Sequence, residues 1–192
     1  MDNGEPNTMI FIRAAVFFTV TLVLAYLSRG ALLNPRSHGF FRFFAWESIL
    51  GLILLNLPVW TVDRFAPHQL VSWVFLIISI VLAIEGFRLL RLIGKPTTAR
   101  TDSELFGFEK TSALVTVGIY AYIRHPLYAA LLFLAWGAFL KSFTPVGVLL
   151  ISVASVCLFL TAKFDESECL KYFGPTYKDY MRKTKNFVPF VF

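Results

Sequence analysis

Residues 111–128 read TSALVTVGIYAYIRHPLY, and the apolar runs on either side of this stretch decide how the chain folds. Within it, Arg124-His125-Pro126 comes directly before an apolar run, where a solvated loop has to become a buried helix. Proline suits the first position of a helix because its missing N–H would have no partner there. It also pushes the preceding His125 toward an extended conformation. The pattern predicts a helix that begins at Pro126, with Arg124 and His125 directly before its N-terminus. The unpaired backbone N–H groups at a helix N-terminus favour an anion.

The composition is that of a membrane protein. The 192 residues are 57% hydrophobic, include 21 phenylalanines and have a mean hydropathy of +0.67, whereas soluble domains are less apolar. The net charge of +6 could indicate a nucleic-acid partner, but the basic residues lie beside the apolar runs, which favours membrane topology and anionic lipid. The two cysteines form neither a disulfide nor a metal-site pattern. We therefore expect membrane lipids as partners, and neither nucleic acid nor a metal.

Five apolar runs predict membrane-spanning helices, because about 20 apolar residues cross a hydrocarbon core of ~30 Å. Three of the runs lie in the N-terminal half and two follow the Arg-His-Pro motif. The short link between the last two predicts an antiparallel hairpin. The predicted spans are Met9–Ser28, Phe40–Trp60, Gln69–Ile93, Leu127–Phe143 and Val146–Lys163.

Two stretches outside these spans are expected to form the polar part of the molecule. A polar segment, residues 94–110, precedes residues 111–123, which are apolar but too short to span. The latter predicts a re-entrant or loop segment, allowed only where protein or a cavity satisfies its backbone. From Glu166 the chain becomes amphipathic, and Gly174-Pro175 predicts a helix that stops and restarts.

Two acidic residues fall inside predicted spans, where an ionisable side chain suggests either function or structural pairing. Glu85 can pair with Arg88, three residues further along the same helix. Glu47 has no such local partner. The roles of Glu47 and Glu85 remain open at the level of sequence.

The basic residues predict the orientation of the bundle, because cytoplasmic links carry an excess of Lys and Arg. With an external N-terminus, the basic residues of Arg29–Arg42, Arg88–Arg124 and Lys163–Lys185 face the cytoplasm, and Arg64 and Lys141 lie outside. The sequence thus predicts an all-α membrane protein of about five transmembrane helices. A cytoplasmic re-entrant or loop segment and amphipathic C-terminal helices would form its cofactor pocket.

Four motifs, taken in order, resemble the isoprenylcysteine carboxyl methyltransferase family and the wider group of integral-membrane methyltransferases. The resemblance covers roughly the last 85 residues, and the first 100 match only as generic spans. Two positions depart from the family pattern: Ala130 stands where a glycine is usual, and Asp165 replaces a glutamate. The motifs are Leu114-Val115-Thr116-x-Gly118-x-Tyr120, Arg124-His125-Pro126-Leu127-Tyr128, Asp165-Glu166 and Phe173-Gly174-Pro175-Thr176-Tyr177-Lys178-Asp179-Tyr180.

The resemblance implies an enzyme that methylates the carboxylate of an isoprenylated cysteine with S-adenosyl-L-methionine. It implies a single integral-membrane domain over residues 1–192, with N-terminal spans in residues 1–93 and a catalytic region in residues 94–192. Its partner would be a lipid-linked, prenylated substrate, and its active site would lie on the cytoplasmic side. Oligomeric state does not follow from these motifs.

The site residues follow from the resemblance and from the charges of the cofactor. Carboxylates suit its sulfonium and amino groups, whereas His125, Arg124 or the helix mouth suit its carboxylate. We predict catalytic roles for Arg124 and Glu166. The predicted cofactor-binding residues are Ser112, Ala113, Leu114, Val115, Tyr120, His125, Pro126, Leu127, Tyr128, Asp165 and Glu168.

Other enzyme classes remain open from the residues alone. The chain contains no Gly-x-Gly, so neither a Rossmann fingerprint nor a P-loop is present. A prenylcysteine carboxylate is already ionised near neutral pH and needs no general base. A phospholipid amine would first have to lose a proton, for which Glu166 or His125 is a candidate. The alternatives are therefore another membrane methyltransferase, acting on phospholipid or other isoprenoid acceptors, an NADPH-dependent enzyme like the sterol reductases, and a non-catalytic membrane protein.

The predicted orientation can be tested by cysteine-accessibility labelling at Asn3 and Lys185 in sealed vesicles. We expect the two positions to be labelled from opposite sides, because five spans place the termini on opposite faces. Labelling of both from one side would show that the number of spans is even.

Overall fold

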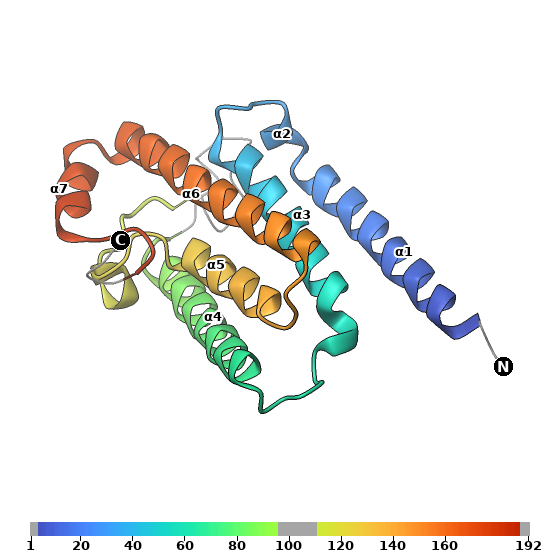
Figure 1. The fold of residues 1–192 in the computed structure, drawn as a ribbon. Coiled ribbons are helices and arrows are strands. Elements are labelled where there is room, and N and C mark those ends of the chain that lie inside the picture. The colour runs from blue at the N-terminus through green and yellow to red at the C-terminus, as the bar shows by residue number, and fades with distance from the viewer. Residues whose placement is uncertain (1–3, 96–110, 189–192) are drawn as a thin grey trace.

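The computed structural model describes residues 4–95 and 111–188, with side chains from residue 8 onward. The predicted polar segment therefore lies outside the described residues from residue 96 to residue 110. Within the described ranges there is no β-strand, which confirms the all-helical prediction. The elements are α1 (Gly4–Leu27), α2 (Arg29–Leu32), α3 (His38–Asn56), η1 (Leu57–Val59), α4 (Pro67–Leu92), η2 (Gly118–Ala121), α5 (Pro126–Phe139), α6 (Pro145–Phe173) and α7 (Pro175–Lys183) (Figure 1).

Four described helices are long and apolar enough to cross a membrane, and they lie at Thr8–Leu27, His38–Val59, Pro67–Leu92 and Pro145–Phe173. The fourth predicted span is shorter than expected. Helix α5 begins at Pro126 as predicted but ends at Phe139, so its 14 residues extend only ~21 Å. Within the described residues, the five predicted spans thus correspond to four long helices and one shorter apolar helix. Helix α6 is longer than expected and continues unbroken past Lys163.

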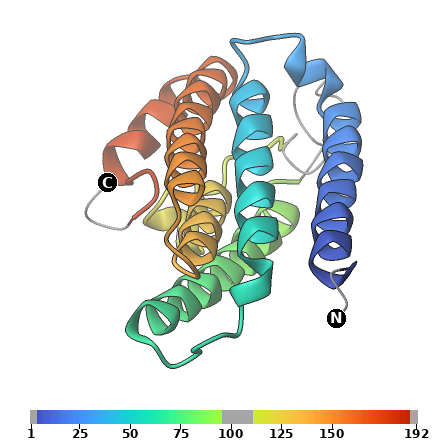
Figure 2. The same ribbon diagram turned by 45° about the vertical axis from the view of Figure 1, so that its right-hand side comes forward.

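Small residues let α5 pack closely between α4 and α6. Its buried face includes Ala129, Ala135 and Ala138, all 0% exposed, and small residues allow helix backbones to approach one another. Two hydroxyls of α4 also bond to carbonyls of α5: Ser72 Oγ to Gly137 O at 2.7 Å and Ser79 Oγ to Ala130 O at 2.8 Å. In Figure 2, α6, α3 and α1 stand side by side, with α5 and α4 behind them.

Both acidic residues inside predicted spans have pairing partners. Glu47 of α3 accepts a hydrogen bond from Thr21 of α1 at 2.6 Å, which joins α1 to the rest of the bundle. Glu85 and Arg88 form an exposed ion pair at 2.7 Å, as their spacing predicts. Glu85 is therefore paired within its own helix, whereas Glu47 uses one oxygen to join α1 to α3 and its Oε1 is buried without a hydrogen-bond partner among the described residues.

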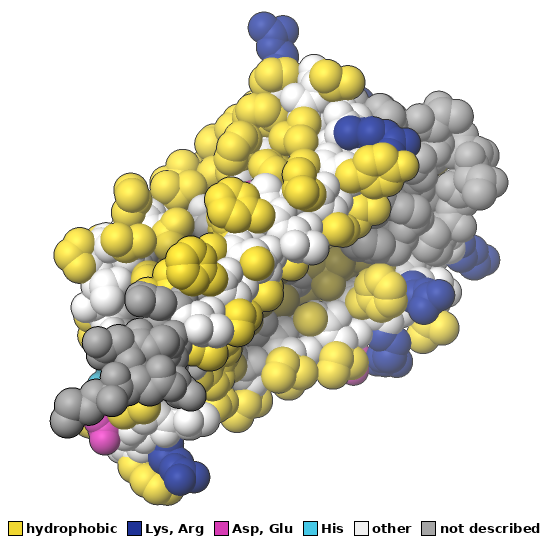
Figure 3. All heavy atoms as spheres, turned by 90° about the vertical axis from the view of Figure 1, so that its right-hand side faces the viewer, with side chains coloured by type: hydrophobic (Ala, Val, Ile, Leu, Met, Phe, Trp, Pro, Cys, Tyr) yellow, Lys and Arg dark blue, Asp and Glu magenta, His cyan; other side chains and the backbone are white. Residues whose placement is uncertain are grey.

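The outer surface of the bundle is apolar over most of its length. Figure 3 shows hydrophobic side chains across one face, with lysine and arginine toward its edges. Large exposed side chains include Phe18 of α1, Ile77 of α4 and Leu149 of α6. A soluble monomer rarely exposes so wide an apolar surface. Together with the four long helices, this surface is that of an integral membrane protein.

Lys141 closes the end of the bundle that lies away from the Arg-His-Pro motif. Although it lies at the predicted external end of the span Leu127–Phe143, its side chain is buried, with 2% of the residue exposed. Its Nζ donates to Gln69 Oε1 at 3.0 Å and lies 3.5 Å from the centre of the Trp73 ring. Burial lowers the pKa of Lys141. This contact ties the α5–α6 link to α4.

The close approach of α4 and α5 predicts that Gly137→Ala destabilises the protein. A Cβ at Gly137 would lie 2.9 Å from Leu76 Cγ and 3.3 Å from the Leu76 backbone nitrogen. We expect a loss of about 1–3 kcal/mol, typical of overpacking, seen as a lower unfolding temperature in detergent. Gly51→Ala is the matched control, because its nearest neighbour is the flexible end of Leu150. Equal losses for both variants would contradict this packing.

Candidate functional site

The segment before α5 meets α6 and α7 around one cavity at the end of the bundle. The cavity encloses about 760 Å³, counting the space at its open mouth, which is within the usual range for small-molecule sites. Its walls come from α3, α4, residues 111–128, α6 and α7. The lining residues are His38, Leu90, Thr111, Leu114, Val115, Tyr120, Arg124, His125, Pro126, Leu127, Tyr128, Asp165, Cys169, Phe173, Tyr177 and Tyr180.

His125 is the most completely buried ionisable group that faces this cavity from the segment before α5. It precedes Pro126, the first residue of α5, with φ −122° and ψ 61°, so it lies outside the helical region. Its ring stacks on Tyr128 with centroids 5.4 Å apart. Nδ1 lies 3.4 Å from Asp165 Oδ2 and Nε2 lies 3.6 Å from Glu166 Oε1. Nε2 is buried and has no hydrogen-bond partner among the residues that the structure describes.

Two carboxylates determine the charge of this imidazole. Burial alone lowers the pKa of His125, but the facing carboxylates of Asp165 and Glu166 outweigh it and raise the pKa above its usual value. The ring is therefore held in its protonated form more firmly than a free histidine. A protonated imidazole has two N–H donors, and here Nδ1 faces Asp165 while the buried Nε2 lies nearest to Glu166.

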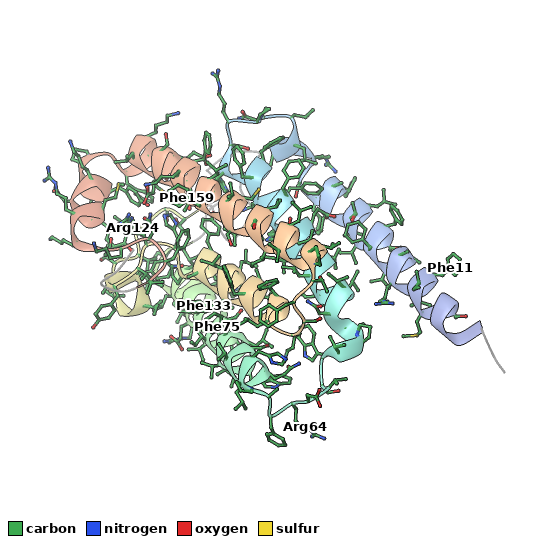
Figure 4. The ribbon with its side chains drawn as sticks, in the orientation of Figure 1. Phe11, Arg64, Phe75, Arg124, Phe133 and Phe159 are labelled. Atoms are coloured by element: carbon green, nitrogen blue, oxygen red, sulfur yellow. The ribbon has the colours of Figure 1, made fainter. Side chains whose placement is uncertain are left out.

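Arg124 is partly buried beside His125 and points toward the C-terminal part of the chain. Figure 4 places it near α7, at the end of the bundle. Its guanidinium pairs with Glu166 Oε1 at 2.8 Å and donates to Met181 O at 3.1 Å. It also donates to the carbonyl of Thr184 and to the side-chain oxygen of Asn186. All of these partners belong to the protein, so Arg124 joins the segment before α5 to α6 and to the C-terminal segment.

The acidic residues of α6 point in three directions. Asp165 lines the cavity and faces His125. Glu166 lies outside the lining and pairs with Arg124. Glu168 turns toward α3, where it accepts from the backbone N–H of His38 at 3.1 Å and lies 2.8 Å from its Nδ1. Of the three carboxylates, only Asp165 faces the cavity directly.

Tyrosines and a glycine turn shape the opposite wall. Gly118, at the start of η2, has φ +60°, and a Cβ there would lie 2.7 Å from Leu89 Cδ1. Only glycine fits this turn without strain. The turn presents Tyr120, whose hydroxyl donates to Gly86 O at 3.3 Å and whose carbonyl accepts from Tyr180 at 2.7 Å. Burial raises the pKa of Tyr180, so its hydroxyl stays a neutral donor.

Most of the predicted site residues converge on the cavity, and four do not. Ser112 and Ala113 lie beside the end of α4, where their backbone N–H groups bond to Gly94 O. Glu166 and Glu168 are turned toward Arg124 and His38, as described above. The predicted residues that line the cavity are Leu114, Val115, Tyr120, Arg124, His125, Pro126, Leu127, Tyr128 and Asp165.

The structure adds residues that sequence reasoning did not assign to a site. Phe173, Tyr177 and Tyr180 recur at helical spacing beside the break at Gly174, so a local signal was present. His38 and Leu90 lack any such signal, because only the packing of α3 and α4 against the later segments brings them to the cavity. Across residues 4–95 and 111–188, no three His, Cys, Asp or Glu side chains gather as metal ligands.

Comparison with known proteins identifies methyltransferases. The family model described as phospholipid methyltransferase matches residues 67–176, more than half of the chain. The chain is 31% identical over 98 residues to the protein-S-isoprenylcysteine O-methyltransferase of Tribolium castaneum, which covers 50% of this chain and 35% of that protein. It is 32% identical over 84 residues to the same enzyme of Schizosaccharomyces pombe, covering 43% and 35%.

The matched regions cover only part of each protein that was compared. The chain spans about a third of the length of the two curated relatives. No solved structure matches it. The family match begins at the start of α4 and ends in α7, so α1 to α3 and the residues after 176 lie outside it.

The geometry at His125 predicts a pH-dependent contribution to stability. The pKa of His125 is raised in the folded protein, so protonation of His125 stabilises the folded state. This stabilisation is complete at a pH well below about 6.5, the pKa of histidine in the unfolded chain, and is lost as pH rises through the folded-state pKa. We expect the difference in unfolding temperature between wild type and His125→Gln to shrink as pH rises. Thermal unfolding of both proteins in detergent across neutral pH measures it. A difference that stays constant with pH would contradict the assignment.

Proposed function

This chain belongs to the phospholipid methyltransferase family, and from that premise we propose that it transfers a methyl group from S-adenosyl-L-methionine to the carboxylate of an isoprenylated cysteine or a similar lipid-linked acceptor. The observation that carries the proposal is the cavity in which His125 and Asp165 face each other between apolar and aromatic walls. Helix α3 contributes His38 to that cavity. We therefore treat residues 1–192 as one domain, because the first 93 residues help to build the site.

The groups in the cavity suit the charges and surfaces of S-adenosyl-L-methionine. Asp165 offers a carboxylate to its cationic groups, and the Nε2–H of protonated His125 offers a charge-assisted hydrogen bond to its carboxylate. Leu114, Val115 and Tyr120 supply apolar and aromatic surface for the adenine. When bound, the cofactor supplies an electrophilic methyl group.

The proposed reaction requires little acid–base catalysis by the protein. A prenylcysteine carboxylate is ionised near neutral pH and attacks carbon without a general base. The contribution of this chain is to orient the acceptor and to exclude water from the site. The apolar outer surface of the bundle would let a lipid-linked acceptor approach from within the membrane. We assign catalysis here to positioning and desolvation.

For Arg124 and Glu166, whose catalytic roles stay a prediction, we propose in addition that they position their neighbours. The guanidinium of Arg124 is engaged by Glu166 and by the C-terminal segment, and Glu166 does not line the cavity. Glu168 likewise holds His38 rather than facing the cavity. We propose that these residues act through His125 and His38, which they hold in place.

A phospholipid amine is the second candidate acceptor, and the description of the matching family favours it. Methylation of an amine needs a group that removes a proton. His125 is a candidate base in this cavity, and the carboxylates of Asp165 and Glu166 that face it raise its pKa. The carboxylate acceptor remains our first proposal, because both curated relatives are named protein-S-isoprenylcysteine O-methyltransferases.

We propose that the cavity faces the cytoplasm. Six exposed basic side chains lie on the described part of α6, α7 and the residues that follow, toward the end of the bundle that carries the cavity. They are Lys163, Lys171, Lys178, Arg182, Lys183 and Lys185. An excess of basic residues marks the cytoplasmic side of membrane proteins.

The proposal is tested with the purified protein in lipid nanodiscs and radiolabelled S-adenosyl-L-methionine. We expect methylation of N-acetyl-S-farnesylcysteine to give a base-labile ester, and none of its preformed methyl ester, which has no free carboxylate. Phosphatidylethanolamine in the same nanodiscs should remain unlabelled. Labelled lipid without labelled farnesylcysteine would favour the amine acceptor instead.

A binding measurement tests the cofactor independently of the methyl acceptor. S-adenosylhomocysteine should raise the unfolding temperature, because a ligand that binds only the folded state stabilises it. Asp165→Asn should weaken this binding by about tenfold to a hundredfold, the effect of one charge-assisted contact. Stabilisation by NADPH and not by S-adenosylhomocysteine would move the protein to the reductase class.

A further inference from the structure

The residues after α7 return to the Arg-His-Pro motif and run beside it. We call residues 184–188 the C-terminal strap. Figure 1 shows this red segment turning back toward the yellow segment that precedes α5. Ile123 and Lys185 form a parallel bridge. The backbone hydrogen bonds are Lys185 N to Tyr122 O at 3.0 Å, Arg124 N to Lys185 O at 2.7 Å and His125 N to Asn186 O at 3.2 Å.

Phe187 forms one side of the pocket that holds the His125 ring. It is 2% exposed and packs in the main core cluster with Tyr128 and Ala129. Its ring centroid lies 6.3 Å from that of His125, and Tyr128 stacks on the imidazole at 5.4 Å. The imidazole therefore has aromatic contacts from α5 and from the strap, which limit its rotation.

Asn186 fixes the residue next to His125. Its side-chain oxygen accepts from the guanidinium of Arg124, and its backbone oxygen accepts from the N–H of His125. Thr184 supplies a second acceptor for Arg124 and ties the strap to α7 by donating to Tyr180 O at 2.8 Å. The strap thus holds both side chains of the motif while Glu166 holds Arg124 from α6.

We propose that the C-terminal strap is a positioning element of the cofactor site, and that Asn186 and Phe187 set the orientation of His125 toward the cavity. The proposal rests on the function proposed above, and it extends the site beyond residue 176, where the family match ends. Neither residue lines the cavity, so both act through His125. Asn186 acts through the backbone of His125 and through Arg124, and Phe187 acts through its ring contact with the imidazole.

Paired variants test each contact. Asn186→Ala removes an acceptor of Arg124, whereas Asn186→Asp keeps an oxygen in the same place. Phe187→Ala opens a cavity beside the imidazole, whereas Phe187→Leu keeps much of the apolar volume. Lys185→Ala is the matched control from the same strap, because its side chain is exposed and its backbone bonds remain. All five variants are compared with wild type at equal folded concentration, judged by their unfolding transitions.

Cofactor binding is the first measurement. We expect the Kd for S-adenosylhomocysteine to rise about tenfold in Asn186→Ala and Phe187→Ala, as for one lost charge-assisted contact, and to change little in Asn186→Asp, Phe187→Leu and Lys185→Ala. The same pattern should appear in KM for S-adenosyl-L-methionine, with kcat less affected. Wild-type affinity in folded Asn186→Ala and Phe187→Ala would overturn the proposal.

Histidine NMR is the second measurement, and it does not depend on the cofactor. The chain contains three histidines, so His125 can be assigned by its loss in His125→Gln. We expect its titration midpoint to move toward the ordinary value in Asn186→Ala and Phe187→Ala, because the raised pKa depends on fixed distances of 3.4 and 3.6 Å to two carboxylates. An unchanged titration in folded variants would overturn the strap's role. Failure of wild type to bind S-adenosylhomocysteine, with the histidine shifts as expected, would instead refute the proposed function alone.

Discussion

The constraint on which this end of the molecule depends is the partial burial of Arg124, whose side chain is only 9% exposed. An arginine cannot give up its charge and has only donors to offer, so a buried one must be surrounded by acceptors. The chain meets this demand from three places that are distant in sequence: a carboxylate on α6, a carbonyl on α7, and the strap that follows α7. Satisfying one cation draws the C-terminal part of the chain around the Arg-His-Pro motif. The cavity is the space left between these elements.

The short helix α5 determines how deep that cavity lies. Its small residues allow α4 and α6 to pack on either side, and Pro126 gives it an abrupt start. Because α6 is about twice as long, it continues past the level at which α5 begins. The extra length carries Asp165, Glu166 and Glu168 alongside the motif. Unequal helix lengths thus place polar groups beside an apolar bundle without a separate domain.

The electrostatics of His125 follow from this architecture. Two carboxylates stabilise the imidazolium, and burial keeps water from screening them. The raised pKa of His125 is thus a consequence of this architecture. The description of the family and the names of the two curated relatives point to different acceptors, a phospholipid in one case and an isoprenylcysteine in the other.

Local patterns were sufficient to predict the apolar helices, the start of α5 at Pro126, the break at Gly174-Pro175 and the Glu85–Arg88 pair. Each of these depends on neighbours within a few residues, where backbone geometry leaves few alternatives. The sequence also identified most of the cavity-lining residues, through the motifs that carry them. It did not predict the short α5, the partners of Arg124, or the contacts of His38 and the strap. His38 and Glu168 are 130 residues apart, and Arg124 and Asn186 are 62 apart. Only tertiary packing decides such pairs, because no local spacing specifies which of several carboxylates a distant cation or imidazole will meet.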